Sequence, residues 1–132
     1  RPDDLLAGGT AGVAWDTVDF HQRNRLARRS DMRWTASSAI EVHGLCVWWS
    51  ATLADGITLS TSPLCEATHW EQLFFPALEP VKVSKGETLV ATLRSRSSEE
   101  AGTDMAWSLA VETSAGKVRA KQALSLDKGF IP

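Results

Sequence analysis

The feature that most constrains the fold of this chain is a period-2 alternation of apolar and polar side chains. From Met105 to Val111, every second residue is large and apolar, and the residues between them are small or polar. This pattern is typical of a strand with one buried face, because successive side chains point to opposite sides of a sheet. The alternation resumes from Val118 to Leu126 after the turn Ser114-Ala115-Gly116, with Gln122 as one polar residue on the apolar side. These segments are therefore predicted to form an antiparallel hairpin.

Two further turn signals predict more strands. The segment from Thr88 to Arg94 also alternates, and Lys85-Gly86 predicts a turn that joins it in a hairpin to Val81–Val83. Farther upstream, Asp55-Gly56 predicts a turn leading into a strand at residues 57–60.

The stretch from Ser38 to Leu53 is longer than a typical strand of about 5 to 6 residues. Its alternation changes phase at Gly44, since Ile40 and Val42 share one parity and the apolar residues from Leu45 onward share the other. A glycine at such a change predicts a bulge or bend, which allows a sheet to curl.

Only the region from Gln22 to Ser30 could hold helix, and we expect a loop or a short helical turn there because it lacks β-branched residues. The fold class is therefore predicted as all-β, an antiparallel barrel or sandwich built as a meander of about eight to nine strands. Residues 1–16 are expected to be a flexible or truncated N-terminal segment. Residues 17–132 are expected to form a single β-barrel domain.

Composition excludes several classes of protein. The chain is 43% hydrophobic and 23% charged with a net charge of −2, which argues against a nucleic-acid or membrane-surface protein. We expect it to be a cytoplasmic protein and to have no membrane partner. Cys46 and Cys65 are expected to be reduced, partly buried thiols, and the alternative is one disulfide between them if the protein is secreted. No metal site is expected, because neither has a second Cys or His at a suitable spacing.

A cluster of basic residues interrupts this acidic chain. Its members are His21, Arg23, Arg25, Arg28, Arg29 and Arg33. The cluster is either a docking strip for an acidic peptide or a missing domain, or a solvated loop that maintains solubility. Because no aromatic residue lies among these arginines, nucleic acid is not expected as a partner.

Adjacent tryptophans form another unusual feature. Trp48 and Trp49 have opposite parity, so one of the two indoles is predicted to point away from the interior. We expect Trp48 to be the outward one. An indole on the outside of a sheet is either covered by another domain or serves as an interface anchor.

The triplet Thr68-His69-Trp70 is the strongest candidate for chemistry. It follows a turn-rich segment and precedes the apolar run Leu73-Phe74-Phe75. An imidazole beside an indole at such a junction could relay a proton to a carboxylate while the ring lines a cationic pocket. The alternative is that His69 is a hydrogen-bonded packing residue.

Several ordered motifs surround this triplet. They are Ser60-Thr61-Ser62-Pro63 before it and Glu71-Gln72, Pro76, Glu79-Pro80, Val81, Val83, Lys85-Gly86-Glu87 and Thr92-Leu93 after it. Together they resemble the THW-loop region of the protein arginine N-methyltransferase family, in its C-terminal β-barrel. The resemblance extends, more faintly, from about Val18 to Leu126.

The resemblance implies a larger two-domain enzyme, in which a Rossmann-like domain binds S-adenosylmethionine and the β-barrel forms one wall of the arginine groove. By resemblance, His69 is the catalytic residue and pairs with an acidic residue of the other domain. Trp70 shapes the substrate pocket, and Thr68 fixes the loop and binds substrate. The partners implied are an arginine-containing protein substrate, the parent's own Rossmann-like domain and a possible homodimer.

No cofactor is expected to bind this chain. The glycine cluster from Gly8 to Gly12 follows no strand and opens no amphipathic helix, so it lacks the context of a cofactor-binding turn. The fragment alone is therefore not expected to be an enzyme. Two alternatives remain: a non-catalytic β-sandwich interaction module that kept the family fold, and a lectin-like barrel that binds sugars through exposed tryptophans.

Overall fold

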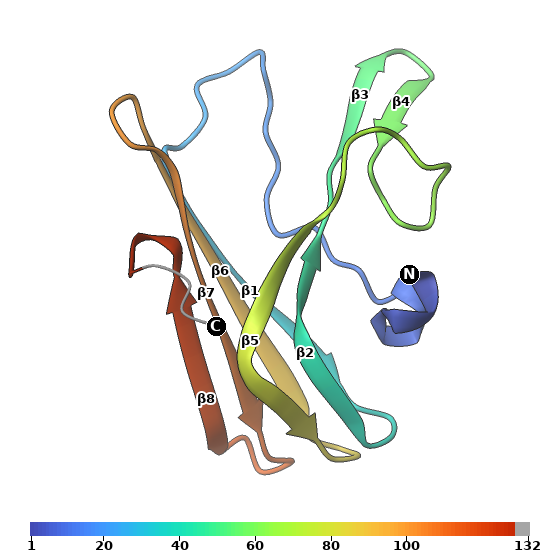
Figure 1. The fold of residues 1–132 in the computed structure, drawn as a ribbon, viewed down its shortest axis with the longest axis vertical. Helices are drawn as coiled ribbons and strands as arrows, with labels where there is room; N and C mark the ends of the chain where they lie inside the picture. Colours follow the sequence, from blue (N-terminus) through green and yellow to red (C-terminus); the bar gives the residue numbers. More distant parts are fainter. Residues whose placement is uncertain (129–132) are drawn as a thin grey trace. The chain divides into compact units, whose positions relative to one another are not determined.

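The computed structural model describes residues 1–128 as an all-β chain (Figure 1), which confirms the predicted fold class. Short 3-10 turns, Pro2–Asp4, Leu6–Gly9 and Leu126–Lys128, lie at its two ends. The strands, in chain order, are β1 (Ala27–Thr35), β2 (Ile40–Val47), β3 (Ser50–Ala54), β4 (Ile57–Ser60), β5 (Leu73–Val83), β6 (Thr88–Ser98), β7 (Gly102–Glu112) and β8 (Val118–Ser125). None of the helical turns within residues 1–128 is long and apolar enough to span a bilayer.

The chain divides into two compact units. The first comprises residues 1–12 and 44–76, and the second comprises residues 13–43 and 77 onward. Strands β2 and β5 each contribute residues to both units. The candidate triplet belongs to the first unit.

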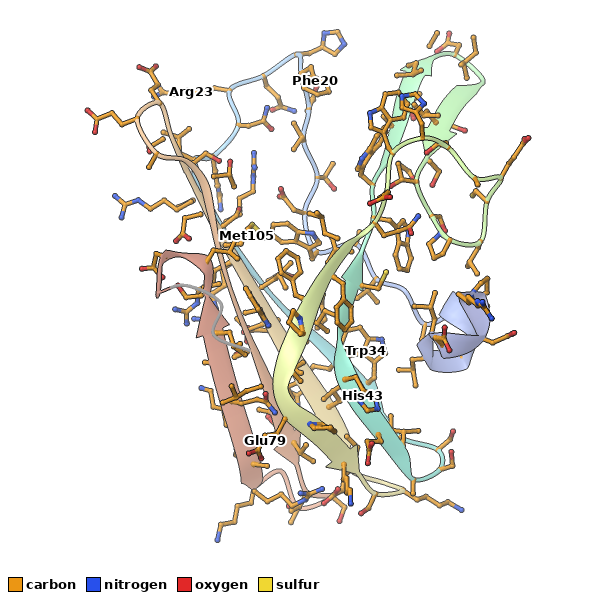
Figure 2. All side chains as sticks on the ribbon, viewed as in Figure 1. Phe20, Arg23, Trp34, His43, Glu79 and Met105 are labelled. Atoms are coloured by element: carbon orange, nitrogen blue, oxygen red, sulfur yellow. The ribbon has the colours of Figure 1, made fainter. Side chains whose placement is uncertain are left out.

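A four-stranded antiparallel sheet with the order β1-β6-β7-β8 forms the second unit's framework. The predicted hairpin of β7 and β8 is confirmed, with Trp107 opposite Leu124 and Val111 opposite Ala120. One face of the sheet is buried, while the alternate residues of β6 and β7 on the other face are half-buried or exposed. The buried residues, each no more than 3% exposed, are Leu89, Ala91, Leu93, Trp107, Leu109 and Val111. Each fully buried leucine of this set contributes about 2 kcal/mol to folding. Trp34 on β1 and Met105 on β7 (Figure 2) lie opposite two buried residues of β6, Leu89 and Ser95 respectively.

Strand β1 corrects one prediction. Residues 22–26 are loop as expected, but Ala27–Ser30 begin a strand instead of continuing a loop or helical turn. The inward positions of β1 start with Arg28 and Ser30, so the polar ends of the strand hid its period of two. Pairing with β6 over its whole length outweighs the weak β propensity of this segment.

The turn at Lys85-Gly86 forms, but the predicted hairpin does not. Gly86 has a φ of 84°, a left-handed conformation that favours glycine. The strands that flank this turn belong to different sheets, since β5 pairs with β2 while β6 pairs with β1 and β7. The prediction of a simple meander is wrong for the same reason, because β1 and β6 are neighbours in space but not in sequence.

Strands β2 and β5 form a two-stranded sheet in which Gly44 lies at a close approach. A Cβ atom added at Gly44 would be 2.5 Å from the carbonyl oxygen of Phe75 and 2.8 Å from the ring of Phe74. Glycine is therefore required here because the facing backbone leaves no room for a side chain. The alternation of exposed and half-buried residues along β2 stops at Gly44, where the phase change was predicted, and the strand itself ends later, before Trp48-Trp49.

The predicted turn at Asp55-Gly56 joins β3 and β4 in an antiparallel hairpin, in which Ala51 faces Leu59. Gly56 has a φ of 74°, as a tight hairpin turn requires. This hairpin leads directly into the segment that carries the candidate triplet.

Gln122, the polar residue on the apolar side of β8, has a structural role. Its Oε1 accepts hydrogen bonds from the backbone N–H groups of Leu78 and Glu79, and its Nε2 donates to the carbonyl of Glu79 at 2.8 Å. A side-chain amide thus satisfies the backbone of β5 at a point where these groups have no ladder partner on β8.

Candidate functional site

The triplet Thr68-His69-Trp70 lies in the loop of residues 61–72, which connects β4 to β5 (Figure 1). His69 and Trp70 are exposed, and Thr68 is half-buried. An exposed loop between two strands is a usual location for functional side chains, because the flanking strands fix its ends. The structure thus brings the three predicted site residues together at the surface of the first unit.

Hydrogen bonds around Thr61 hold the two ends of this loop together. Thr61, which is 2% exposed, donates its backbone N–H to the carbonyl of Trp49 at 2.9 Å. In return, the N–H of Trp49 donates to the hydroxyl of Thr61 at 3.1 Å. At the other end, Nε2 of Gln72 donates to the carbonyl of Thr61 at 2.7 Å. The first and last residues of the loop are therefore joined directly.

The triplet has its own internal hydrogen bonds. The hydroxyl of Thr68 accepts from the N–H of Trp70 at 3.2 Å and donates to the carbonyl of Trp70 at 3.1 Å. This local arrangement is a threonine turn, in which a side chain replaces a missing backbone partner. It fixes the backbone on either side of His69 and leaves the imidazole free to face outward.

Three aromatic side chains pack in series at this surface. The rings of His69 and Trp70 have centroids 4.1 Å apart and are tilted by 33°. Trp70 in turn meets Trp49 in an edge-to-face contact, with centroids 5.8 Å apart and an interplanar angle of 62°. Such pairs prefer this geometry because the edge of one ring is positive and the face of the other is negative.

A shallow depression of about 230 Å³ adjoins the triplet. Thr61, Ser62, Cys65, Glu66, Thr68 and Gln72 contribute to its lining. Hydroxyl, amide and carboxylate groups therefore face this space, and its charged lining residues are of both signs, Glu66 and Arg1.

The first unit also exposes many large apolar side chains. They are Leu6, Trp49, Leu53, Ile57, Leu64, Trp70, Leu73 and Phe74, with exposures from 39% to 64%. Of the adjacent tryptophans, Trp49 is exposed and Trp48 is half-buried, so the expectation that Trp48 is the outward one is wrong. The sequence offered no signal for the orientation of this pair, since it depends on the strand break at Trp48-Trp49.

Three of the six residues of the basic cluster form ion pairs within the second unit. Arg28 pairs with Asp16 at 2.9 Å, Arg29 pairs with Asp31 at 3.3 Å, and Arg33 pairs with Glu112. The hydrogen bonds and charge of Glu112 raise the pKa of Arg33. These three arginines therefore belong to the sheet, and they do not form a free docking strip.

The loop before β1 presents Phe20, which is 91% exposed (Figure 2). Asn24 fastens this loop, because its Oδ1 accepts from the N–H of Asp19 at 3.1 Å and its Nδ2 donates to the carbonyl of Asp19 at 2.7 Å. The pKa of Asp19 is lowered, chiefly because its carboxylate accepts a hydrogen bond from the N–H of His21. This loop is therefore held by hydrogen bonds to Asn24 and still exposes the aromatic ring of Phe20.

Both cysteines are free thiols, but the expectation of partial burial holds for Cys46 and is wrong for Cys65. Cys46 is half-buried, and its burial raises the pKa of its thiol, whereas Cys65 is exposed. Thr61 and Gln72 belong to the sequence motifs that surround the triplet, but their anchoring role was not predicted. That role depends on the hydrogen bonds that join Thr61 to Trp49 and to Gln72, which no sequence pattern indicates.

Comparison with known proteins identifies the family. The model of the arginine methyltransferase oligomerization subdomain matches residues 11–114. Arginine N(omega)-methyltransferase of Streptomyces achromogenes subsp. streptozoticus is 42% identical over 59 residues, which is 45% of this chain and 16% of that protein. Probable protein arginine N-methyltransferase 3 of Oryza sativa subsp. indica is 28% identical over 116 residues, which is 83% of this chain and 18% of that protein.

A third relative, protein arginine N-methyltransferase 6 of Xenopus tropicalis, is 31% identical over 86 residues, covering 64% of this chain and 25% of that protein. The chain thus spans a quarter or less of the length of these relatives. The family model covers most of the chain and includes the whole of the loop that carries Thr68, His69 and Trp70. We conclude that this chain belongs to the arginine methyltransferase oligomerization subdomain family.

Proposed function

We propose that this chain is the substrate-binding domain of a protein arginine N-methyltransferase homologue and forms one wall of the groove that receives the arginine. The observation that carries the proposal is the exposed aromatic series of His69, Trp70 and Trp49 on a loop fixed at both ends. Membership of the family supports this proposal, since the loop lies within the matched residues 11–114.

The chemistry of these side chains suits a guanidinium substrate. The half-exposed indole of Trp70 offers a π-face, which attracts a planar cation and stacks on it. The imidazole of His69 lies beside that indole and faces outward, so it is available to pair with a carboxylate contributed by another domain. Thr68 holds the backbone of both residues and thereby keeps the wall in shape.

S-adenosylmethionine, held by a Rossmann-like domain of the parent, would supply the methyl group. The reaction we propose transfers that methyl from the sulfonium sulfur to a guanidinium nitrogen: the carbon–sulfur bond breaks, a carbon–nitrogen bond forms, and the nitrogen loses one proton. The part of this chain is to orient the guanidinium and to exclude water from it, which contributes to rate by fixing the reactants in position.

Large exposed apolar side chains support a role next to other protein surfaces. Leu73 and Phe74, at the start of β5, are each about 60% exposed and follow the candidate loop directly. The family's description as an oligomerization subdomain supports a homodimer. We propose the parent's own Rossmann-like domain, a second subunit and an arginine-containing protein as the partners, in a cytoplasmic setting.

The test is methyl transfer by the intact protein that contains this chain. In His69→Ala, radiolabel transfer from S-adenosylmethionine to an arginine-rich peptide should fall at least about 10-fold, while the unfolding midpoint stays close to that of the unsubstituted protein, because His69 is exposed. His21→Ala is the matched control, since His21 is an exposed histidine in the other unit. Equal transfer rates in His69→Ala and His21→Ala would contradict the proposed role and favour a non-catalytic interaction module.

A further inference from the structure

We infer that Trp49 is a positioning residue for the Thr68-His69-Trp70 triplet and that Thr61 and Gln72 act with it as the anchor of the 61–72 loop. This inference rests on the proposed function and deepens it, because it names residues outside the triplet on which the triplet depends. Two observations support it, one on the backbone hydrogen bonds of Trp49 and one on the contact made by its ring.

The backbone of Trp49 holds the start of the loop. Its N–H and its carbonyl are both bonded to Thr61, through the hydroxyl and the N–H of that threonine. Because Thr61 is almost fully buried, these bonds are partly shielded from competing water. The amide of Gln72 then brings the end of the loop to the same residue, at 2.7 Å from the carbonyl of Thr61.

The ring of Trp49 holds the middle of the loop. Thr68 fixes the backbone of Trp70, but it does not restrict rotation of the indole about its side-chain torsions. The edge-to-face contact with Trp49 supplies that restriction, and the orientation of Trp70 then determines which surface the imidazole of His69 packs against. The series Trp49, Trp70, His69 therefore transmits a fixed orientation from the strand framework to the imidazole.

The two contributions can be separated by substitution. The hydrogen bonds of Trp49 use only backbone atoms, so Trp49→Leu retains the tie to Thr61 and removes only the aromatic contact. Gln72→Leu does the reverse, since it retains both indoles and removes the amide that closes the loop. Trp49→Phe keeps an aromatic ring and serves as the conservative variant. Trp15→Phe is the control, because it removes a half-buried indole far along the chain from the loop.

The first measurement is spectroscopic and uses the full 132-residue chain. Edge-to-face indoles in contact give an exciton couplet in the far-ultraviolet circular dichroism spectrum. We expect the couplet in the unsubstituted chain and in Trp15→Phe, its loss in Trp49→Phe, and a weaker couplet in Gln72→Leu. A couplet of full strength in Gln72→Leu would overturn the part assigned to Gln72.

The second measurement follows the ring protons of His69 by NMR. Packing against Trp70 shifts these resonances through the ring current of the indole, and Trp49→Leu should move them toward the values of an unstacked histidine. Trp49→Phe should restore part of the shift. Unchanged His69 resonances in Trp49→Leu would overturn the inference. Should Trp49→Leu fail to fold, Trp49→Phe and Gln72→Leu decide the question by the same resonances.

The third measurement is methyl transfer by the intact protein. Because a small misplacement of a catalytic group costs rate more than binding, Trp49→Leu should lower kcat by about 10-fold or more with little change in KM, and Trp49→Phe should recover most of it. An unchanged kcat in Trp49→Leu would contradict the positioning role. If His69→Ala transfers methyl at the normal rate while Trp49→Leu still moves the His69 resonances, the proposed function fails and the anchor stands.

Discussion

The guanidinium of Arg119 on β8 donates hydrogen bonds to both carboxylate oxygens of Glu87, each at 2.6 Å. The same carboxylate accepts from the N–H of Ser84 at 2.8 Å, and Arg119 also donates to the carbonyl of Lys82 at 2.7 Å. This pair therefore ties β8 to the turn between β5 and β6. It joins strands that belong to different sheets, at the place where the sequence suggested a simple hairpin.

The pair predicts how stability depends on pH. The hydrogen bonds from Arg119, and then that from Ser84, lower the pKa of Glu87 from 4.5 to about 2. A carboxylate whose pKa is lower in the folded state stabilises the fold above its unfolded pKa, and this contribution is lost as the pH falls. We expect the free energy of unfolding to decrease from about pH 4.5 down to about pH 2, and Glu87→Gln to reduce that decrease.

Denaturant titrations at a series of pH values provide the measurement. Asp19 and Asp31 also have lowered pKa values, so Glu87→Gln should flatten the acid limb without removing it. Glu99→Gln, at an exposed position in the β6–β7 turn, is the matched control. Identical acid limbs for Glu87→Gln and Glu99→Gln would show that the pair makes no contribution.

Gly44→Ala should destabilise the chain by about 1 to 3 kcal/mol, because the new methyl group meets the Phe75 carbonyl and the Phe74 ring in a space with no room for it. Gly56→Ala is the comparison: its Cβ would meet nothing within 4 Å, so only the left-handed backbone is penalised, by about 1 kcal/mol. Both values come from equilibrium denaturation. A smaller cost at Gly44 than at Gly56 would contradict the close approach of β2 and β5.

Gln122→Leu should lower the free energy of unfolding by about 1 to 2 kcal/mol, since the N–H groups of Leu78 and Glu79 lose their acceptor and must be solvated instead. Hydrogen exchange offers a more direct measurement, because the amides of these two residues should exchange faster in the variant. Lys121→Leu, on the opposite face of β8, controls for the change in polarity. Unaltered exchange at both amides would disprove the role of Gln122.

Phe20→Ala should change stability by less than about 0.5 kcal/mol, because the ring is 91% exposed and buries little on folding. Leu93→Ala, at a fully buried position on β6, should cost about 2 to 5 kcal/mol in the same denaturation experiment. A large loss for Phe20→Ala would mean that the ring packs against the protein in solution.

Local sequence patterns predicted much of this structure, but they did not predict which strands pair. The period of two on β7 identified the buried face correctly, because Trp107, Leu109 and Val111 report directly on which side is apolar. The turn at Lys85-Gly86 was also correct as a turn. Its hairpin was not, since a turn determines the direction of the chain but not which strand the next segment joins.

The candidate site shows the same division. Thr68, His69 and Trp70 are adjacent in sequence, so their association in one loop needed no tertiary information. Predicting the anchor would have needed tertiary information, because Trp49 lies far from Gln72 along the chain. A glutamine or a tryptophan alone does not indicate such a role. Likewise, Arg28 was grouped with a solvated cluster, although its side chain turns inward and pairs with Asp16. Only the three-dimensional pairing of β1 distinguishes it from its neighbours.

The pairing of β1 with β6 also has a consequence for synthesis on the ribosome. Thr35, at the end of β1, faces Thr88, which is added 53 residues later. The nascent β1 therefore remains unpaired until β6 has been synthesised, and contacts between residues distant in sequence form slowly. The arginines of β1 give this unpaired strand a positive charge, and such charges disfavour its association with another unfolded chain.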